Sequence, residues 1–412
     1  MRGWRVFLGR LVRRIWFRAA MFSLAAIALA LLAGVLGPFL PDALAVELGQ
    51  NSVDSILQII ASSMLAVTTF SLTAMVSAYS AATTTATPRA TQLLVADPTS
   101  QNALSTFIGS FLFSIVGIVA LSTGYYTEQG RTVLFFGTLA VIAIIAITLL
   151  RWIAHLAQFG RMADVIDRVE QAATRAARAF AARPHLGASP GVPVPTRARA
   201  VFADDIGYVT AVDVDRLQRL AESEDLIVHV AAIPGTMADH VRPLAHIEGD
   251  LDDDGCRTLR RAFSVDPHRT YEQDPRLGVI ALAEIASRAL SPSTNDPGTA
   301  IEVLGALERV FAVLAAAPDD DDACDRVHAP APGIRDLIED GFRPIARDGA
   351  GMIEVHVRLQ KTLAACAASC PAHADEFARA ARAARERADR TLTERSDRAL
   401  LRTTAREAWM RR

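Results

Sequence analysis

The 412-residue sequence is nearly without lysine, and it has no cysteine before residue 256. Lys361 is the single lysine, so the basic side chains are almost all arginine. Acidic and basic residues nearly balance, with a formal net charge of −2, which gives no electrostatic case for a nucleic-acid partner. All four cysteines follow the last long hydrophobic segment, and in a cytoplasmic region we expect them to stay reduced rather than form disulfides.

The motifs of common enzyme chemistry are also missing. The chain has no glycine-rich phosphate loop, no nucleophile elbow and no HExxH pair of metal-binding histidines. An Asp-rich segment from Asp250 matches the first half of a calcium loop, but Arg261 stands where the closing carboxylate should be, so we interpret it as a solvated turn. Cys366 and Cys370 share one helical face, where buried free thiols are expected rather than metal ligands. We expect no enzyme activity, no cofactor and no metal.

Four hydrophobic segments in the first 161 residues are long enough to cross a bilayer. Each approaches or exceeds the ~20 apolar residues that a helix needs to span the hydrocarbon core. None has a charged residue near its centre, which argues against a transporter that relies on an intramembrane ion pair or proton relay. The predicted spans are residues 19–40, 56–82, 104–125 and 133–153.

The distribution of arginines sets the predicted orientation of these spans. Arginines recur before residue 19 and again after the fourth span, whereas the loop at residues 41–55 carries only acidic charges. By the positive-inside rule both termini are cytoplasmic, in a multi-pass protein of the cytoplasmic membrane. The first span has an alternative interpretation as a signal peptide cleaved near residues 43–45, but its length and the three further spans favour a retained helix.

The second predicted span carries an unusual row of hydroxyl groups. The row recurs every three or four residues and comprises Thr69, Thr73, Ser77, Ser80, Thr84 and Thr87. This spacing places the hydroxyls along one side of a helix, and we expect that side to face protein or water rather than lipid. The row either lines a narrow water-filled path in an oligomer or lets neighbouring helices pack closely. Packing is the simpler interpretation, because small residues at this spacing are common in membrane bundles.

The chain changes character after residue 161. Residues 162–199 are predicted to form a connecting helix that continues the fourth span, followed by a linker rich in proline and glycine. Alternating runs within residues 200–249 predict a small β-subdomain with one short helix. Residues 250–412 are predicted to be helical and to end in one long charged helix over 372–409. The predicted fold is therefore an α-helical membrane domain followed by a mostly helical α+β cytoplasmic domain.

Residues 291–300 form the most distinctive segment of the soluble part. Pro292 ends one predicted helix, Asp296 is a suitable N-cap for the next, and Pro297 suits the first helical position. The simpler interpretation is a helix–loop–helix corner whose polar side chains satisfy backbone groups. The alternative is a polar nest that binds an ion or a partner chain at a helix N-terminus. The residues that would complete such a nest are Arg269, Asp274 and Arg288.

This segment resembles the signature of a bacterial membrane-protein family catalogued as domain of unknown function 2254. The family motif Ser-Pro-x-x-Asn-Asp-Pro-x-Thr-Ala is matched here by Ser291, Pro292, Asn295, Asp296, Pro297, Thr299 and Ala300. Weaker matches lie at residues 70–73, 88–89, 207–209 and 269–274. The resemblance implies four spans in the bacterial inner membrane and a soluble C-terminal region. It implies no activity, so it leaves the function open.

Two functions agree with these features. The first is an oligomeric pore or permeation protein, in which the second span lines the path and the cytoplasmic domain assembles or gates it. The alternative is a membrane-anchored sensor or scaffold whose cytoplasmic domain binds a ligand or a protein. Arg89, just after the second span, is expected near the inner membrane surface, where it can reach headgroups or a carboxylate. An enzyme would be indicated only if Arg269, Asp274, Asn295 and Asp296 met in a deep pocket.

Overall fold

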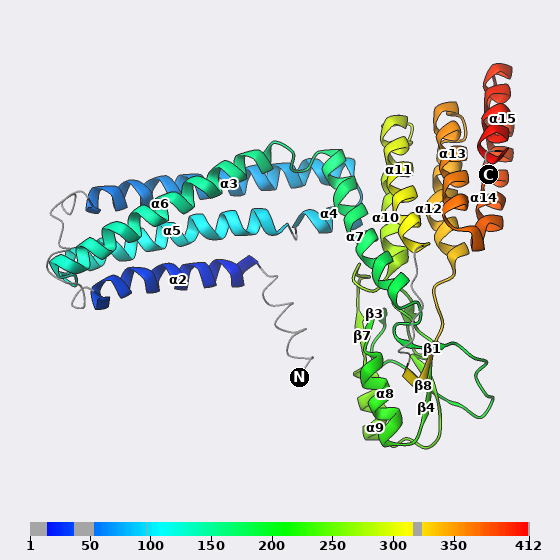
Figure 1. The fold of residues 1–412 in the computed structure, drawn as a ribbon, viewed down its shortest axis with the longest axis horizontal. Helices are drawn as coiled ribbons and strands as arrows, with labels where there is room; N and C mark the ends of the chain where they lie inside the picture. Colours follow the sequence, from blue (N-terminus) through cyan, green and yellow to red (C-terminus); the bar gives the residue numbers. More distant parts are fainter. Residues whose placement is uncertain (1–14, 37–52, 96, 316–323, 411–412) are drawn as a thin grey trace. The chain divides into compact units, whose positions relative to one another are not determined.

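The computed structural model describes two compact units of the chain (Figure 1). The described residues are 15–36, 53–95, 97–315 and 324–410. The N-terminal unit consists of Met1–Thr84 and Thr91–Asp164, and the C-terminal unit consists of Thr85–Ala90 and Val165–Arg412. Because residues 85–90 belong to the C-terminal unit, the chain passes between the units three times.

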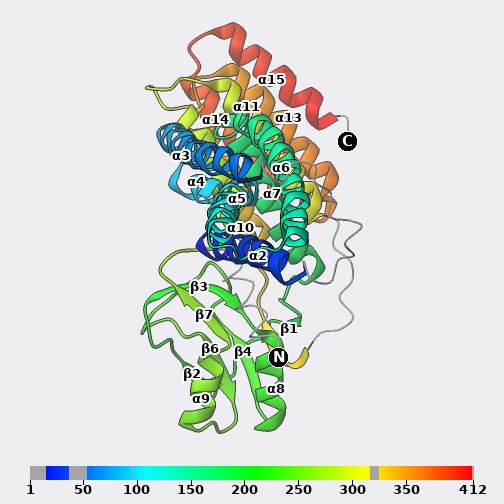
Figure 2. The same ribbon diagram turned by 90° about the vertical axis from the view of Figure 1, so that its left-hand side faces the viewer.

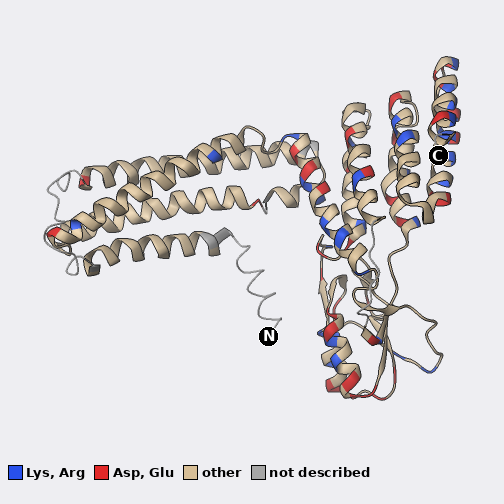
Figure 3. Ribbon diagram, viewed as in Figure 1, with Lys and Arg blue, Asp and Glu red and all other residues tan. Residues whose placement is uncertain are grey.

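Four long apolar helices and one short helix make up the N-terminal unit (Figure 1). They are α2 (Ile15–Leu36), α3 (Val53–Thr85), α4 (Pro88–Val95), α5 (Pro98–Ser122) and α6 (Glu128–Leu156). Helices α3, α5 and α6 are long and apolar enough to cross a membrane, whereas the apolar part of α2, Ala19–Val35, is shorter. Their ribbons carry few charged residues (Figure 3). The structure thus supports three candidate spans among the described residues, and the end of the predicted first span, 37–40, lies outside them.

Small residues and polar side-chain contacts hold these helices together. A side-chain carbon at Gly109 of α5 would lie 3.3 Å from the backbone oxygen of Phe22 in α2, so glycine here lets the two helices approach closely. Trp152 of α6 donates its indole N–H to the Ser71 hydroxyl of α3 at 2.9 Å, which satisfies a buried donor inside the apolar core. Among the described residues of this unit, the opposite side of α3 is exposed, as at Phe70 and Val76.

The C-terminal unit contains two small sheets, with strands that come from distant parts of the sequence (Figure 2). The strands are β1 (Ala188–Pro190), β2 (Arg199–Val201), β3 (Gly207–Val212), β4 (Ile227–Val230), β5 (Met237–Ala238), β6 (Ala245–Glu248), β7 (Phe263–Asp266) and β8 (Cys324–Ala329). The strand orders are β1-β8-β4-β6-β2 and β5-β3-β7. Strand β4 pairs antiparallel with β6 and parallel with β8. Helices α8 (Val214–Ser223) and α9 (Asp253–Arg260) contribute Leu217 and Leu259 to the core beneath the sheets.

The remaining helices stand side by side in the C-terminal unit (Figure 1). They are α7 (Met162–Ala182), α10 (Pro275–Ala289), α11 (Pro297–Leu314), α12 (Ile334–Asp348), α13 (Ile353–Ser369), α14 (Ala374–Thr391) and α15 (Arg395–Met410), with a short 3-10 turn at Pro371–His373. A side-chain carbon at Gly278 would lie 2.6 Å from the Cα of Ala173, so this glycine lets α10 pack closely on α7. The rings of Phe311, Phe342 and Phe377 join α11, α12 and α14, with centroids 5.3–6.5 Å apart.

Three details differ from the sequence-based expectations. The predicted continuation of the fourth span is interrupted, because Gly160 adopts a φ of +78° between α6 and α7. The predicted helix over 372–409 is two helices, because Leu392 is extended and buried against Leu401, which turns α15 back onto the start of α13. The sheets also extend beyond residues 200–249, because β1, β7 and β8 lie outside that range.

Candidate functional site

Most of the predicted hydroxyl row lies on the side of α3 that points away from the core of the N-terminal unit, whereas Thr87 lies beyond the end of α3 and is buried. The exposed members are Thr69, Thr73, Ser77 and Ser80, while the Thr84 side chain lies outside the described part. Leu57, Met64 and Ser71, on the opposite side of the same helix, are buried in the core. The structure therefore does not use these hydroxyls to pack the described helices of one copy against each other.

Two hydroxyls of this row already use their hydrogens within the helix, which leaves their oxygens as acceptors. Thr69 and Thr73 donate their hydroxyl hydrogens to the backbone oxygens of Leu65 and Thr69, each at 3.0 Å. Each hydroxyl oxygen keeps lone pairs that can still accept a hydrogen bond. Large apolar side chains flank the row, with Phe70 68% and Val76 56% exposed. The result is a narrow line of uncharged hydroxyl groups between exposed apolar side chains.

The Ser291–Ala300 segment forms the corner between α10 and α11. Asp296 caps α11, because its carboxylate accepts hydrogen bonds from the Thr299 amide at 3.1 Å and the Thr299 hydroxyl at 2.6 Å. These two hydrogen bonds lower the pKa of Asp296. Pro297 occupies the first turn, and Asn295 adopts a φ of +50°, a left-handed conformation that asparagine tolerates better than most residues. Ser291 donates its hydroxyl to the Arg288 carbonyl at 2.7 Å.

Arg269 and Asp274 form an ion pair at the other end of α10, in which Asp274 is buried and Arg269 is partly buried. Both Nε and Nη2 of Arg269 lie 2.7 Å from Oδ2 of Asp274. Burial raises the pKa of Asp274, while Arg269 and two backbone amides at the start of α10 oppose this effect. A side-chain carbon at Gly235, whose φ is +92°, would lie 2.6 Å from the Asp274 carboxylate, so the β-turn packs directly on the ion pair.

Helix α10 separates the Arg269–Asp274 ion pair from the Ser291–Ala300 corner. Helix α10 has 15 residues, and at 1.5 Å per residue it spans about 22 Å. Asp274 lies at its start, whereas the Asp296 amide bonds to the Ala289 carbonyl at its end, at 2.8 Å. Arg269 and Asp274 therefore do not meet Asn295 and Asp296 in one pocket, which is the arrangement that would have indicated an enzyme.

Residues 85–90 are held in the C-terminal unit by contacts that sequence reasoning missed. Arg89 forms an ion pair with Glu284 of α10, so the carboxylate it reaches belongs to the protein. The Tyr271 hydroxyl donates to the Arg89 carbonyl at 2.9 Å, and Nη1 of Arg288 donates to the Ala86 carbonyl at 3.1 Å. A single feature of the sequence indicated these contacts: Arg89 follows just after the second predicted span and has no acidic residue within the next few positions to pair with. Helix α10 thus fixes the chain that continues from α3.

Three comparisons with known proteins bear on this architecture. A protein-family model described as "Predicted membrane protein (DUF2254)" matches residues 12–365. Uncharacterised proteins of Mycobacterium bovis (strain ATCC BAA-935 / AF2122/97) and Mycobacterium tuberculosis (strain ATCC 25618 / H37Rv) are each 31% identical over 191 residues. That alignment covers 43% of this chain and 36% of each relative, so the chain matches little more than a third of their length. No solved structure matches the chain.

Proposed function

This chain belongs to the DUF2254 family of predicted membrane proteins, and on that premise we propose that it is an oligomeric membrane protein in which the hydroxyl row of α3 lines a permeation path. The observation that carries the proposal is the exposure of Thr69, Thr73, Ser77 and Ser80 on the side of α3 opposite the core. In a single copy this row would face lipid acyl chains. Acyl chains carry no hydrogen-bonding group, so the hydroxyls would find no partner there. Around the axis of an oligomer it would face water or a permeating species.

The proposed topology has four spans, with both termini in the cytoplasm of a bacterial inner membrane. Helix α2 is the first of these four spans: its apolar part Ala19–Val35 has 17 residues, at the lower end of spanning lengths, and joins the three longer candidates. Large apolar side chains on α2, such as Leu24 and Leu32, are exposed and suit a lipid environment. The arginines before residue 19 supply the positive-inside signal.

The C-terminal unit is proposed to assemble or gate the path through residues 85–90. The chain passes directly from the end of α3 into this segment, which Glu284, Tyr271 and Arg288 hold. A displacement of α10 would therefore pull on the end of the proposed pore-lining helix through the covalent chain. This arrangement needs no ionisable residue inside the spans.

Conductance of the full chain in planar bilayers tests the proposal. We expect Thr73→Leu and Ser77→Leu to reduce conductance strongly, because each replaces an acceptor oxygen with a branched apolar side chain. Val76→Leu is the matched control, because Val76 lies on the exposed apolar flank of the same helix and the change keeps it apolar. If the parent protein shows no conductance, or if all four proteins conduct equally, the hydroxyl row does not line a permeation path.

The second candidate is a membrane-anchored sensor or scaffold, in which the helices of the N-terminal unit only anchor and couple. The observation that favours it is an arginine-lined cavity in the C-terminal unit. Ligand binding to the C-terminal unit by a protein that shows neither conductance nor self-association would favour this function over a pore.

A further inference from the structure

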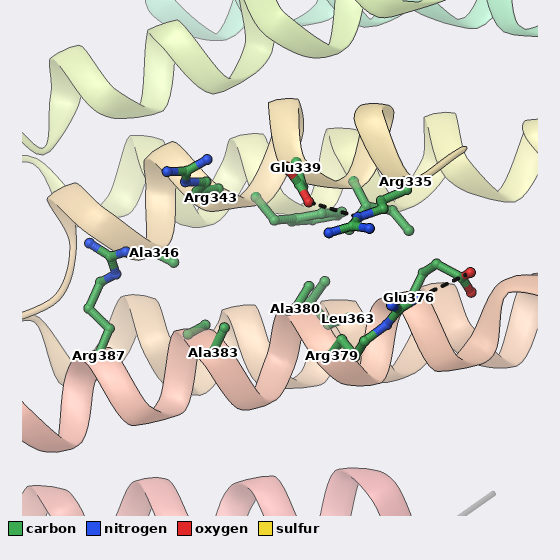
Figure 4. A pocket seen from close by; sticks show the side chains of 13 residues that line it. Arg335, Glu339, Arg343, Ala346, Leu363, Glu376, Arg379, Ala380, Ala383 and Arg387 are labelled. Carbon is green, nitrogen blue, oxygen red and sulfur yellow. Dashed lines mark hydrogen bonds and ion pairs between the residues drawn. The ribbon is translucent and has the colours of Figure 1, made fainter. Parts of the chain in front are cut away.

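A cavity of about 320 Å³ opens between α12 and α14 in the C-terminal unit (Figure 4). Its size falls in the range of small-molecule sites. Its apolar lining comes from all three helices around it: Ile338 and Phe342 of α12, Leu363 of α13, and Ala380, Ala383 and Ala384 of α14. The three alanines recur at helical spacing on one face of α14, so a small side chain stands at each position where a larger one would close the space.

Arginines surround this apolar lining, and the two ends of the cavity differ in charge (Figure 4). At one end, Arg335 pairs with Glu339 at 3.1 Å and Arg379 pairs with Glu376 at 3.2 Å, so the charges balance. The other end is lined by Arg343, Ala346 and Arg387. The cavity therefore carries two more positive than negative side chains.

The two arginines at that end are available for a ligand. Within the described parts of the chain, neither Arg343 nor Arg387 has a carboxylate within ion-pair distance. Asp348 is a carboxylate that feels Arg387: hydrogen bonds from Arg347 and Ser287 lower its pKa, and the charge of Arg387 adds to this effect. The carboxylate of Asp348 is already held by Arg347, at 2.6 and 2.9 Å. Two guanidinium groups that line the same end of one cavity are suited to bind a carboxylate or phosphate group.

We propose that this cavity binds an organic anion with a short apolar body. The anionic group would lie between Arg343 and Arg387, and the apolar body would extend along Phe342, Ile338 and the alanine face of α14. A free inorganic anion would leave the apolar lining unused, and a neutral apolar molecule would leave the two guanidinium groups unneutralised. This inference is independent of the permeation path, since none of its residues lies in the N-terminal unit.

Calorimetric titration of the full chain in phosphatidylcholine nanodiscs tests the proposal, with empty nanodiscs as the reference for partitioning into lipid. The probe is octanoate. Its matched probes are octan-1-ol, which has the same body without charge, octylammonium, which has the opposite charge, and inorganic phosphate, which has charge without a body. We expect saturable binding of octanoate alone. Equal binding of octanol would overturn the role of the arginines, and equal binding of phosphate would overturn the role of the apolar lining.

Three variants locate the site. Arg343→Gln and Arg387→Gln should each weaken octanoate binding by roughly tenfold, the loss typical of one charge-assisted contact. Ala380→Leu should also weaken binding, because it fills the cavity without changing any charge. Arg382→Gln, on α14 but outside the cavity lining, is the matched control and should bind as the parent does. Parent-like binding by all the variants, or no octanoate binding by the parent, would overturn the proposal.

Discussion

His356 should make the stability of the C-terminal unit depend on pH. Its side chain is fully buried on α13, and burial, aided by the nearby Arg387 charge, lowers the pKa of His356 to about 4 from 6.5. Between these two values the unfolded chain binds the proton and the folded chain does not. Stability is therefore fully present above about pH 6.5 and is lost as the pH falls toward 4.

The size of this effect follows from the two pKa values. At ~1.4 kcal/mol per pKa unit, the difference between 6.5 and about 4 amounts to about 3.5 kcal/mol. For a unit of this size, 1 kcal/mol moves the melting temperature by roughly 2–4 °C, so this residue alone should lower it by roughly 7–14 °C.

Thermal melts of the full chain in nanodiscs, followed by circular dichroism from pH 4 to pH 8, measure the effect. His356→Leu should flatten the profile, since leucine cannot take up a proton. His240→Gln is the control, because His240 is exposed and should leave the profile of the parent unchanged. The reasoning is refuted if His356→Leu loses stability with falling pH as steeply as the parent does.

Three further predictions concern the helix corner, the β-turn and residues 85–90. Asp296→Ala should cost about 1 kcal/mol of unfolding free energy and Asp296→Ser much less, because serine also caps helices; equal losses in thermal melts would contradict the capping role. Gly235→Ala should destabilise by more than about 2 kcal/mol, because the new side chain strains the backbone and strikes the ion pair behind it. Gly187→Ala has a similar φ of +87° but only contacts beyond 3.6 Å, so it should cost about 1 kcal/mol, and equal melting of the two variants would exclude the collision. Arg89→Gln and Glu284→Gln, measured singly and together, should couple by no more than about 1 kcal/mol, because both side chains are partly exposed; strict additivity would show that the pair does not hold the segment.

Local patterns in the sequence predicted the elements that depend on neighbouring residues. The long apolar runs became α3, α5 and α6, and Asp213 caps α8 through the Arg216 amide, as an acidic residue before a helix suggests. The strand partners were not predictable in this way. Strand β8 joins β4 from about a hundred residues away, and no periodicity within either strand identifies the other.

The same limit applies to the candidate sites. The hydroxyl row was visible in the sequence because it is a helical repeat. Whether it faces the core or the outside could not be predicted, because that depends on the contact between Trp152 and Ser71, which buries the opposite side of α3. The partner of Arg89 could not be read from the sequence, because Glu284 lies 195 residues further along the chain and no local pattern links the two. The arginine-lined cavity was hidden for a different reason. Alanine and arginine alternate along α14 as they do on many solvated helices, and only the position of α12 turns that face into a cavity.

The mass of the full chain in nanodiscs, measured by native mass spectrometry, tests the central claim most directly. A pore lined by α3 requires several copies around one axis, so we predict a single defined oligomer of at least three chains. Thr73→Leu should then be examined for its effect on both mass and conductance. A monomer at every protein concentration would contradict the account, and the exposed hydroxyl row of α3 would then line no path.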